Sequence, residues 1–430
     1  MNKRNKKPLG FIVQFVFVVA VLAIGASLLA GCNKKQAATA DSGPVTITLW
    51  HYFASDQETA GLRKFADDFK KIHPEVTVDI TFVSREELMN QYTVGAVSGQ
   101  LPDIGMVDSP DMASYVSLGV FEDITDELNA WGQLDKFYPG PLSSTKDANG
   151  RIYGLPNNTN CLALACNMDM LNAAGLKKPT TWEELEAAAA KLTNPAQQIY
   201  GFAMSVIPNE EGTFQLIPWI YAAGGSVADL ASPEAIRGIE FISNLAQKGY
   251  MSKEVVNWTQ GDAFNAFAAG KAAMVESGTW HVAQNVPDIK DFVVEYTLLP
   301  KDKKYASVIG GENFGVCSGT KHKDLAVEFL QMISTAESGA YWAEQTGKLP
   351  IRSDSAQLRD IWTKDKYLSV FTDGMQYAVA RGPHPEWPSI SKVIYTSGQA
   401  AVLGQKSARD SMTEGAAAIA PMLAKTPVAQ

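Results

Sequence analysis

The chain has 430 residues, of which 37 are basic and 46 acidic, so its formal net charge is −9. The first 31 residues hold four basic and no acidic side chains, so the remainder carries 33 basic against 46 acidic side chains. This excess of acid argues against nucleic-acid binding and against broad electrostatic docking to anionic lipid. The hydrophobic content of 46% is typical of a globular protein, and the length predicts two or more lobes.

The N-terminus has the pattern of a secretory signal peptide, residues 1–31. Four basic residues precede an apolar run over 9–30, and small residues follow. Leu29-Ala30-Gly31-Cys32 resembles the lipobox of bacterial lipoproteins, in which Cys32 would be acylated on its sulfur and become the mature N-terminus. An uncleaved transmembrane anchor is the alternative, because about 22 apolar residues can span a bilayer. Residues 32–43 are expected to form a flexible tether.

Three further cysteines remain: Cys161, Cys166 and Cys317. Cys161 and Cys166 are five residues apart in an expected strand, so their side chains would point to opposite faces and would not pair. No CxxC motif is present, which argues against a zinc site or a disulfide framework. We expect all three to be small buried hydrophobic residues.

Residues 44–119 predict alternating strands and helices, from the period of their apolar positions. The expected elements are strands 45–50, 76–83 and 104–107 and helices 56–71, 86–97 and 112–118. This order predicts a mostly parallel sheet with helices on both faces. Ligands of such sheets bind at the carboxyl ends of strands, where Trp50, His51 and Asp108 lie.

Further strands and helices are expected in the rest of the chain. The spacing of Thr181 and Glu184 is that of a capping box, which predicts a helix start. The expected strands are 161–167, 272–276, 292–298 and one within 308–317. The expected helices are 185–192, 214–223, 233–247, 262–269, 325–335, 371–380, 390–404 and 411–423. Residues 381–388 are expected to form an irregular loop.

Short motifs over residues 44–425 are individually weak but occur in a characteristic order. They are Leu49-Trp50-His51-Tyr52, Leu101-Pro102-Asp103 with Asp108, Tyr153-Gly154-Leu155-Pro156, Asn167-Met168-Asp169, residues 179–184, residues 267–274 with Ser277-Gly278-Thr279-Trp280, Gly310-Gly311-Glu312-Asn313 and Leu349-Pro350-Ile351-Arg352. In this order they resemble the extracellular solute-binding proteins of ABC importers, family 1. That is the sugar and oligosaccharide group related to the maltose-binding protein.

The resemblance implies an α/β, two-lobed periplasmic-binding-protein fold of type II. Each lobe would be a mostly parallel sheet flanked by helices, with three interlobe crossings near residues 155–162, 299–311 and 346–353. Lobe one would comprise residues 44–155 plus 311–347, and lobe two residues 160–300 plus 353–430. A solute would bind between the lobes, and closure on it would present both lobes to an ABC permease in the membrane.

Such a cleft needs aromatic faces for the C–H side of a sugar ring and bidentate polar groups for its hydroxyls. We therefore expect ligand contacts from Trp50, His51, Asp108, Trp219, Trp280, Glu312, Arg352 and Trp387. Weaker candidates are Asp111, Asn158 and Asn160.

Most of these residues have a structural alternative. Trp50 and Trp219 could be core aromatics, His51 and Asp108 could cap helices, and Arg352 could only stabilise a hinge. Two candidates follow small residues, which let a ligand or a backbone come close. They are Trp280, after Gly278 and Thr279, and Glu312, after Gly310 and Gly311. Trp387 lies between prolines.

The sequence therefore predicts a monomeric receptor, lipid-anchored on the extracytoplasmic face of the cell membrane, that binds a sugar or oligosaccharide and performs no chemistry. A phosphorylated polyol or a polyamine is the alternative solute. A surface enzyme that cleaves glycans with a carboxylate pair is the alternative activity. No G-x-S-x-G, H-E-x-x-H or phosphate-loop motif occurs, so no catalytic residue, metal or cofactor is predicted.

Overall fold

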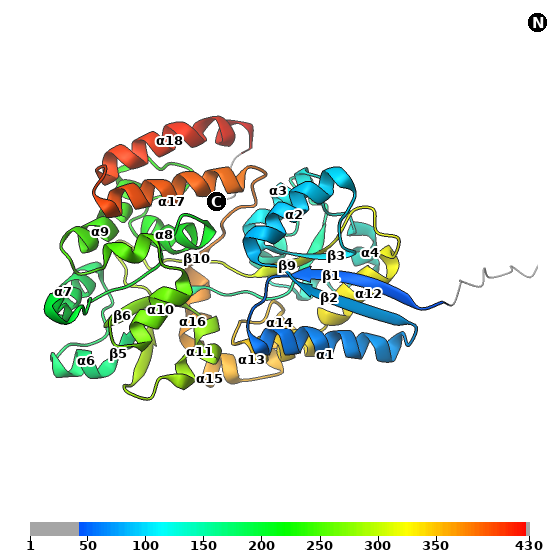
Figure 1. Ribbon diagram of the computed structural model, residues 1–430, viewed down its shortest axis with the longest axis horizontal. Helices are drawn as coiled ribbons and strands as arrows, with labels where there is room; N and C mark the ends of the chain where they lie inside the picture. The colour runs from blue at the N-terminus through cyan, green and yellow to red at the C-terminus, as the bar shows by residue number, and fades with distance from the viewer. Residues whose placement is uncertain (1–42, 427–430) are drawn as a thin grey trace, which may run out of the picture. The chain divides into compact units, whose positions relative to one another are not determined.

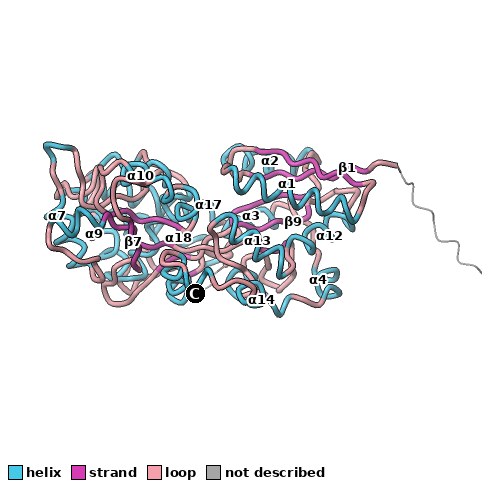
Figure 2. The backbone as a smooth tube through the Cα atoms, turned by 90° about the horizontal axis from the view of Figure 1, so that it is seen from below, coloured by secondary structure: helices cyan, strands magenta, loops and turns pink. Residues whose placement is uncertain are grey.

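The computed structural model describes residues 43–426. The expected signal peptide and the lipidation site Cys32 lie outside the described residues. Among the residues described, no helix has the length and apolar character needed to cross a membrane. Residues from Pro44 onward form one unit that holds two main sheets, each set among helices (Figures 1 and 2).

The first sheet has five strands in the order β2-β1-β3-β9-β4. Their bounds are β1 Val45–His51, β2 Val76–Phe82, β3 Ile104–Asp108, β4 Gly154–Pro156 and β9 Glu312–Val316. β1 is parallel to β2 and β3, whereas β9 is antiparallel to β3 and β4. The carboxyl ends of β1 and β3 and the start of β9 therefore share one edge of the sheet.

Alternation along the strands provides two apolar faces to this sheet. Ile47 and Leu49 pack with Phe65 and Trp342, and Val107 packs on the other face with Tyr92. The helices of this part are α1 Asp56–Ile72, α2 Arg85–Ser98, α3 Met112–Ser117, α4 Thr125–Trp131, α5 Pro139–Ser143, α12 Lys323–Ile333, α13 Ala336–Thr346 and α14 Ser353–Gln357. We call this sheet and these helices the five-stranded body.

The second sheet has three strands in the order β6-β5-β7, with bounds β5 Leu162–Asn167, β6 Met274–Gly278 and β7 Val294–Thr297. Leu162 and Leu164 face one core cluster, and Ala163 and Ala165 face another. The surrounding helices are α6 Met168–Ala173, α7 Trp182–Leu192, α8 Glu210–Ala222, α9 Pro233–Gln247, α10 Gln260–Ala268, α11 Trp280–Gln284, α15 Ile361–Lys364, α16 Leu368–Gly374, α17 Trp387–Leu403 and α18 Ala408–Lys425. We call this set the three-stranded body.

Short elements complete the described chain. A two-stranded ladder pairs β8 Ser307–Val308 with β10 Ala378–Val379. Six 3₁₀ helices are η1 Ser109–Asp111, η2 Leu134–Lys136, η3 Pro195–Gln197, η4 Lys253–Val256, η5 Val286–Asp288 and η6 Met375–Tyr377. The expected helix 371–380 is therefore wrong in its second half, which holds η6 and β10. The three described cysteines are buried and unpaired, as expected.

The expectation of mostly parallel sheets is also wrong. β5 is antiparallel to both β6 and β7, and two of the four pairings in the five-stranded sheet are antiparallel. The reason is long-range: β6 and β9 pair with strands more than 100 residues away, so strand order along the chain does not set their direction. The five-stranded sheet is therefore mixed, and the three-stranded sheet is antiparallel.

Three connections join the two bodies: one follows β4, one follows β7, and the third lies beyond α13. Isolated bridges pair Thr159 with Leu349 and Asn160 with Gly310, so these three segments lie side by side. Arg352 donates to the Ser334 carbonyl and to Gln133 of the five-stranded body. We therefore propose that the third crossing lies after α14, a few residues beyond 346–353.

Candidate ligand-binding site

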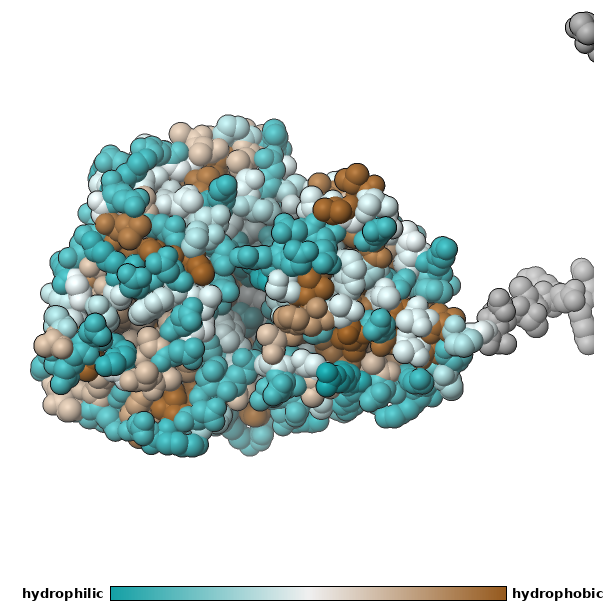
Figure 3. All heavy atoms as spheres, in the orientation of Figure 1, coloured by the Kyte–Doolittle hydropathy of each residue, from teal (hydrophilic) through white to brown (hydrophobic). Residues whose placement is uncertain are grey.

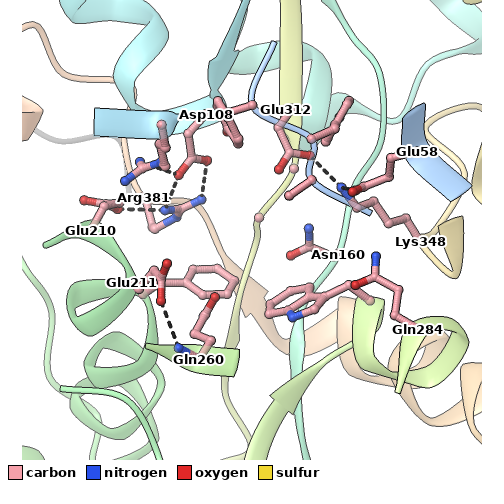
Figure 4. Close-up of a pocket in the computed structure, with 18 residues that line it drawn as sticks. Glu58, Asp108, Asn160, Glu210, Glu211, Gln260, Gln284, Glu312, Lys348 and Arg381 are labelled. Atoms are coloured by element: carbon pink, nitrogen blue, oxygen red, sulfur yellow. Dashed lines mark hydrogen bonds and ion pairs between the residues drawn. The ribbon is translucent and has the colours of Figure 1, made fainter. Parts of the chain in front are cut away.

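An open cavity of about 320 Å³ lies between the two bodies. Figure 3 shows the surface hollowed there, and Figure 4 shows the side chains that line it. Its volume lies at the lower end of the range for small-molecule sites. The charged lining residues are Glu58, Arg85, Asp108, Glu210, Glu211, Glu312, Lys348 and Arg381, and the aromatic ones are Tyr52, Phe53, Phe214 and Trp280.

The five-stranded body contributes the edge of its sheet. Asp108 ends β3 and Glu312 begins β9, and the antiparallel register places the two residues directly opposite each other. Gly311 precedes Glu312 with a φ of 133°, and a Cβ there would lie 2.2 Å from the Asn158 carbonyl oxygen. This close backbone approach requires glycine.

Arg381, in the segment after β10, joins the two bodies. Its guanidinium donates to both Asp108 oxygens, at 2.8 and 3.1 Å, and to Glu210 Oε1 at 2.7 Å. Asp108 belongs to the five-stranded body and Glu210 to the first turn of α8. Burial lowers the pKa of Arg381, but Asp108 and Glu210 outweigh burial and the net shift is upward. Arg381 is therefore a buried, fully charged link.

Lys348 lies in a similar arrangement. Its Nζ is 2.9 Å from Glu58 Oε1 and 3.2 Å from Glu312 Oε2, and it stands 4.4 Å from the centre of the Phe53 ring. Burial lowers the pKa of Lys348, but attraction to Glu312 and Glu58 outweighs burial and raises it. Burial alone would raise the pKa of Glu58, but the charge of Lys348 and its hydrogen bond outweigh burial, so the pKa of Glu58 is lowered.

Arg85, at the start of α2, is the third cation of the cavity. Its Nη2 lies 3.1 Å from both Asp108 Oδ2 and Asp111 Oδ2. Burial raises the pKa of Asp111, and Arg85 opposes that shift. Each of the three cations therefore contacts two carboxylates.

The three-stranded body contributes the opposite wall. Glu211 Oε2 accepts a hydrogen bond of 2.9 Å from the Gln260 backbone N–H, which joins the starts of α8 and α10. Trp280 begins α11, and its ring centre is 6.3 Å from that of Phe214. A Cβ at Gly278 would lie 2.0 Å from the Trp280 ring. Gly278 thus makes room for this tryptophan rather than for a ligand.

Asn160, at the first crossing, has an unpaired acceptor. Its side chain is 4% exposed, lines the cavity, and its Oδ1 has no hydrogen-bond partner among the described residues. A buried amide oxygen without a partner costs free energy, so a donor on a ligand would be stabilising. Figure 4 shows Asn160 between the two walls.

The structure brings three of the eight expected ligand residues to this cavity: Asp108, Trp280 and Glu312. Trp50 and His51 end β1 and point to opposite faces of the sheet. Trp50 stacks near Tyr92, and His51 is 2% exposed and lines a separate cavity of about 260 Å³. Neither lines the cavity between the two bodies, and Trp50 instead lines a separate cavity of about 550 Å³.

The other three expected residues are buried elsewhere. Trp219 donates to Glu276 Oε2 at 2.9 Å in the core of the three-stranded body. Arg352 is 1% exposed and pairs with Asp354. Trp387 is fully buried and donates to Glu210 at 3.2 Å, so it supports a lining residue from behind. Core packing and hinge contacts account for these positions.

Sequence reasoning missed most of the charged lining: Glu58, Arg85, Glu210, Glu211, Lys348 and Arg381. Glu210 and Glu211 follow Asn209, which caps α8, and acids at a helix start have an ordinary structural explanation. Arg381 stands in a segment with no regular pattern. Only the tertiary fold brings these groups together. Among residues 43–426, no cluster of His, Cys, Asp or Glu could hold a metal ion.

The fold and the site define a two-lobed α/β binding protein. A sequence model of the family described as bacterial extracellular solute-binding protein matches residues 64–369, so the chain belongs to this family. The expected family and α/β fold class are thus confirmed.

Relatives of known name extend the comparison. The multiple sugar-binding protein of Streptococcus mutans is 23% identical over 339 residues, which cover 75% of this chain and 78% of that protein. The sn-glycerol-3-phosphate-binding periplasmic protein UgpB of Escherichia coli is 25% identical over 368 residues, which cover 78% of each. A solved ABC transporter solute-binding protein from Thermotoga lettingae, bound with α-D-tagatose, is 25% identical, with a TM-score of 0.80 and coverage of 88% of this chain and 99% of that chain.

Proposed function

We propose that this protein is a receptor of an ABC importer that binds a sugar or oligosaccharide in the cavity between the two bodies. It is anchored by a lipid at Cys32 on the extracytoplasmic face of the membrane. It acts as a monomer, delivers the solute to a permease and performs no chemistry itself. No cofactor takes part.

One observation carries the sugar assignment. Trp280, with Phe214 near it, offers an aromatic surface beside polar groups that retain free hydrogen-bonding capacity. Asn160 Oδ1 has no partner, and Glu211 has one oxygen without a hydrogen bond among the described residues. Aromatic rings suit the C–H face of a sugar, and carboxylate and amide oxygens suit its hydroxyls. The names of the S. mutans and T. lettingae proteins point the same way.

A phosphorylated polyol fits the cavity less well. The E. coli relative is named for such a solute. A phosphate needs cations with free charge, but Arg85, Lys348 and Arg381 each already contact two carboxylates. A polyamine would need several free carboxylates, and among the lining carboxylates only Glu211 takes part in no ion pair within the described residues.

An enzyme that cleaves glycans is also less well supported. A general acid must hold its proton near neutral pH, which needs a raised pKa. Glu58, Asp108, Glu210 and Glu312 are instead held in ion pairs with Lys348 or Arg381. In these pairs the carboxylate oxygens face cations and remain acceptors, which suits the hydroxyls of a bound solute.

Solute binding between two bodies also provides a signal to a permease. Contacts that exist only when both bodies touch the solute favour the closed arrangement. Arg381 already contacts both Asp108 and Glu210. It therefore holds these two lining carboxylates, one from each body, at a fixed position relative to each other.

A thermal-shift panel tests the proposal. The purified protein is heated with mono- and oligosaccharides, glycerol phosphates and polyamines, and each mixture is then analysed for products. We expect an upward Tm shift with at least one sugar and no turnover. A shift only with glycerol phosphates or polyamines would overturn the sugar assignment, and sugar cleavage would overturn the receptor role.

A further inference from the structure

The charges that line the cavity do not balance. Five carboxylates, Glu58, Asp108, Glu210, Glu211 and Glu312, stand against three cations, which leaves a formal excess of two negative charges. Asp111, which contacts Arg85, adds a further carboxyl group next to the lining. In a partly enclosed site with low-dielectric walls, such an excess attracts cations and repels anions.

Two of the three cations, Arg381 and Lys348, do not offset this excess at the centre of the cavity, whereas the Arg85 side chain is 25% exposed. Arg381 is 5% exposed and Lys348 is 4% exposed, and the donors of both are directed at carboxylates. Arg381 also lies 4.5 Å from the centre of the Phe214 ring. Their positive charges are therefore used by the protein itself.

Glu211 is different from the other lining carboxylates. Within residues 43–426 its side chain has a single hydrogen-bond partner, the Gln260 backbone N–H, and takes part in no ion pair. Figure 4 shows Glu211 next to Gln260. Phe214 and Trp280 line the same cavity. The charge of Glu211 is thus available to a ligand, in a cavity with aromatic rings that also attract cations.

A second observation points to a ligand that donates hydrogen bonds. Asn160 is 4% exposed, lines the same cavity, and its Oδ1 is buried without a partner. An ammonium group provides three donors and no acceptor, so it suits a cavity whose unpaired groups are acceptors.

We infer that the natural solute is an amino sugar, whose ammonium group pairs with Glu211 while its hydroxyls and ring contact the remaining lining. This inference rests on the proposed sugar-binding function and narrows it. The rival explanation is that Glu211 and Asn160 accept hydrogen bonds from neutral hydroxyls only. The two explanations differ in whether a positive charge on the solute strengthens its binding.

Calorimetric titration of the full chain, purified in detergent, separates them. The probes are matched sets of hexoses and of their β-1,4 dimers in gluco, galacto and manno configurations. Each set contains the free amine, the neutral sugar, the N-acetyl derivative and, for the hexoses, the 6-phosphate. We expect a free amine to bind about tenfold tighter than its neutral counterpart, because charge-assisted hydrogen bonds are stronger than neutral ones. N-acetylation should remove this advantage, and added salt should reduce it.

Two variants serve as the matched pair. Glu211→Gln keeps an acceptor for the Gln260 N–H but removes the charge, so the affinities for a free amine and for its neutral counterpart should become equal. Glu240→Gln, at an exposed position on α9, should change neither.

The outcomes also separate this inference from the proposed function. If neutral sugars bind and no amine binds more tightly in any set, the amino-sugar inference is overturned and the sugar receptor stands. An amine preference that survives in Glu211→Gln would overturn the role of Glu211. If no sugar of any kind binds, the proposed function fails and this inference fails with it.

Discussion

Asp108 and Arg381 form a bidentate ion pair, with Nη2 2.8 Å from Oδ1 and Nη1 3.1 Å from Oδ2. The two residues are 273 positions apart in the chain. Asp108 ends a strand of the five-stranded sheet, and the same guanidinium contacts Glu210 of the three-stranded body. One buried arginine thus positions carboxylates on both walls of the cavity.

Removing this arginine should destabilise the protein strongly. Arg381→Ala leaves Asp108 and Glu210 buried without a counter-charge, and breaking a buried pair in this way costs about 3–5 kcal/mol. Arg381→Lys restores a charge but not the planar fork, so it should recover only part of the loss. Urea unfolding followed by fluorescence measures both effects.

The exposed pair of Lys406 and Glu414 provides the control. Lys406→Ala should change the free energy of unfolding by less than about 0.5 kcal/mol, since exposed pairs contribute little. A loss below about 1 kcal/mol in Arg381→Ala would show that the buried pair does not hold the site.

Substitution of two tryptophans distinguishes a ligand site in the cavity from a ligand site at the carboxyl end of β1. Trp280→Ala removes the aromatic surface of the cavity and should weaken sugar binding by about 2 kcal/mol or more, which is about 30-fold. Trp50→Ala should leave affinity unchanged, because Trp50 packs near Tyr92 outside the cavity. Titration calorimetry with the same sugar measures both. The reverse result would place the ligand at the end of β1.

Burial of His281 makes stability depend on pH. Burial lowers its pKa to about 3, and the ring stacks 4.1 Å from that of Phe264. Because the folded state disfavours the proton, this contribution is complete above the unfolded pKa of about 6.5 and is lost as the pH falls from there toward 3. Between pH 7 and pH 5 the free energy of unfolding should drop by about 2 kcal/mol on this account.

His281→Phe should therefore flatten this part of the pH profile, while above pH 7 its slope should match that of the unchanged protein. His51, whose pKa burial lowers to about 4, remains in the variant and should keep a slope of similar size, so His281→Phe should remove about half of the combined slope. Urea midpoints at several pH values measure the profile. An unchanged slope between pH 7 and pH 5 would mean that His281 is protonated equally in both states.

Lipid attachment can be tested apart from binding. Cys32→Ala should release the protein from the membrane fraction and remove incorporation of labelled fatty acid, yet leave sugar affinity intact. Cys161→Ala, which changes a buried thiol, should stay in the membrane fraction. Retention of the Cys32→Ala protein would favour an uncleaved transmembrane anchor instead.

Local patterns predicted much of the fold. The spacing of apolar residues predicts a strand at 45–50, where β1 is Val45–His51, and a helix at 56–71, where α1 is Asp56–Ile72. Local patterns do not predict the direction of each strand in the sheet, because β9 joins the first sheet from a distant part of the chain. The register of Asp108 with Glu312 follows from that return and from no local pattern.

The site was only partly predictable for a related reason. Asp108 and Glu312 carried signals, a strand end and a glycine pair, that survive in the structure. By residue type, Trp219 and Trp387 are equally good candidates for sugar contacts, but both lie in the core and donate to buried carboxylates. Arg381 and Lys348 gave no signal, since their role arises from carboxylates distant in sequence.

Titration calorimetry with the sugar that gives the largest Tm shift tests the central claim most directly. We predict saturable binding of one sugar per chain, with the sugar recovered unchanged and the affinity lost in Trp280→Ala. Absence of binding by every sugar, together with saturable binding of another solute class, would contradict the account, and so would conversion of the sugar during the titration.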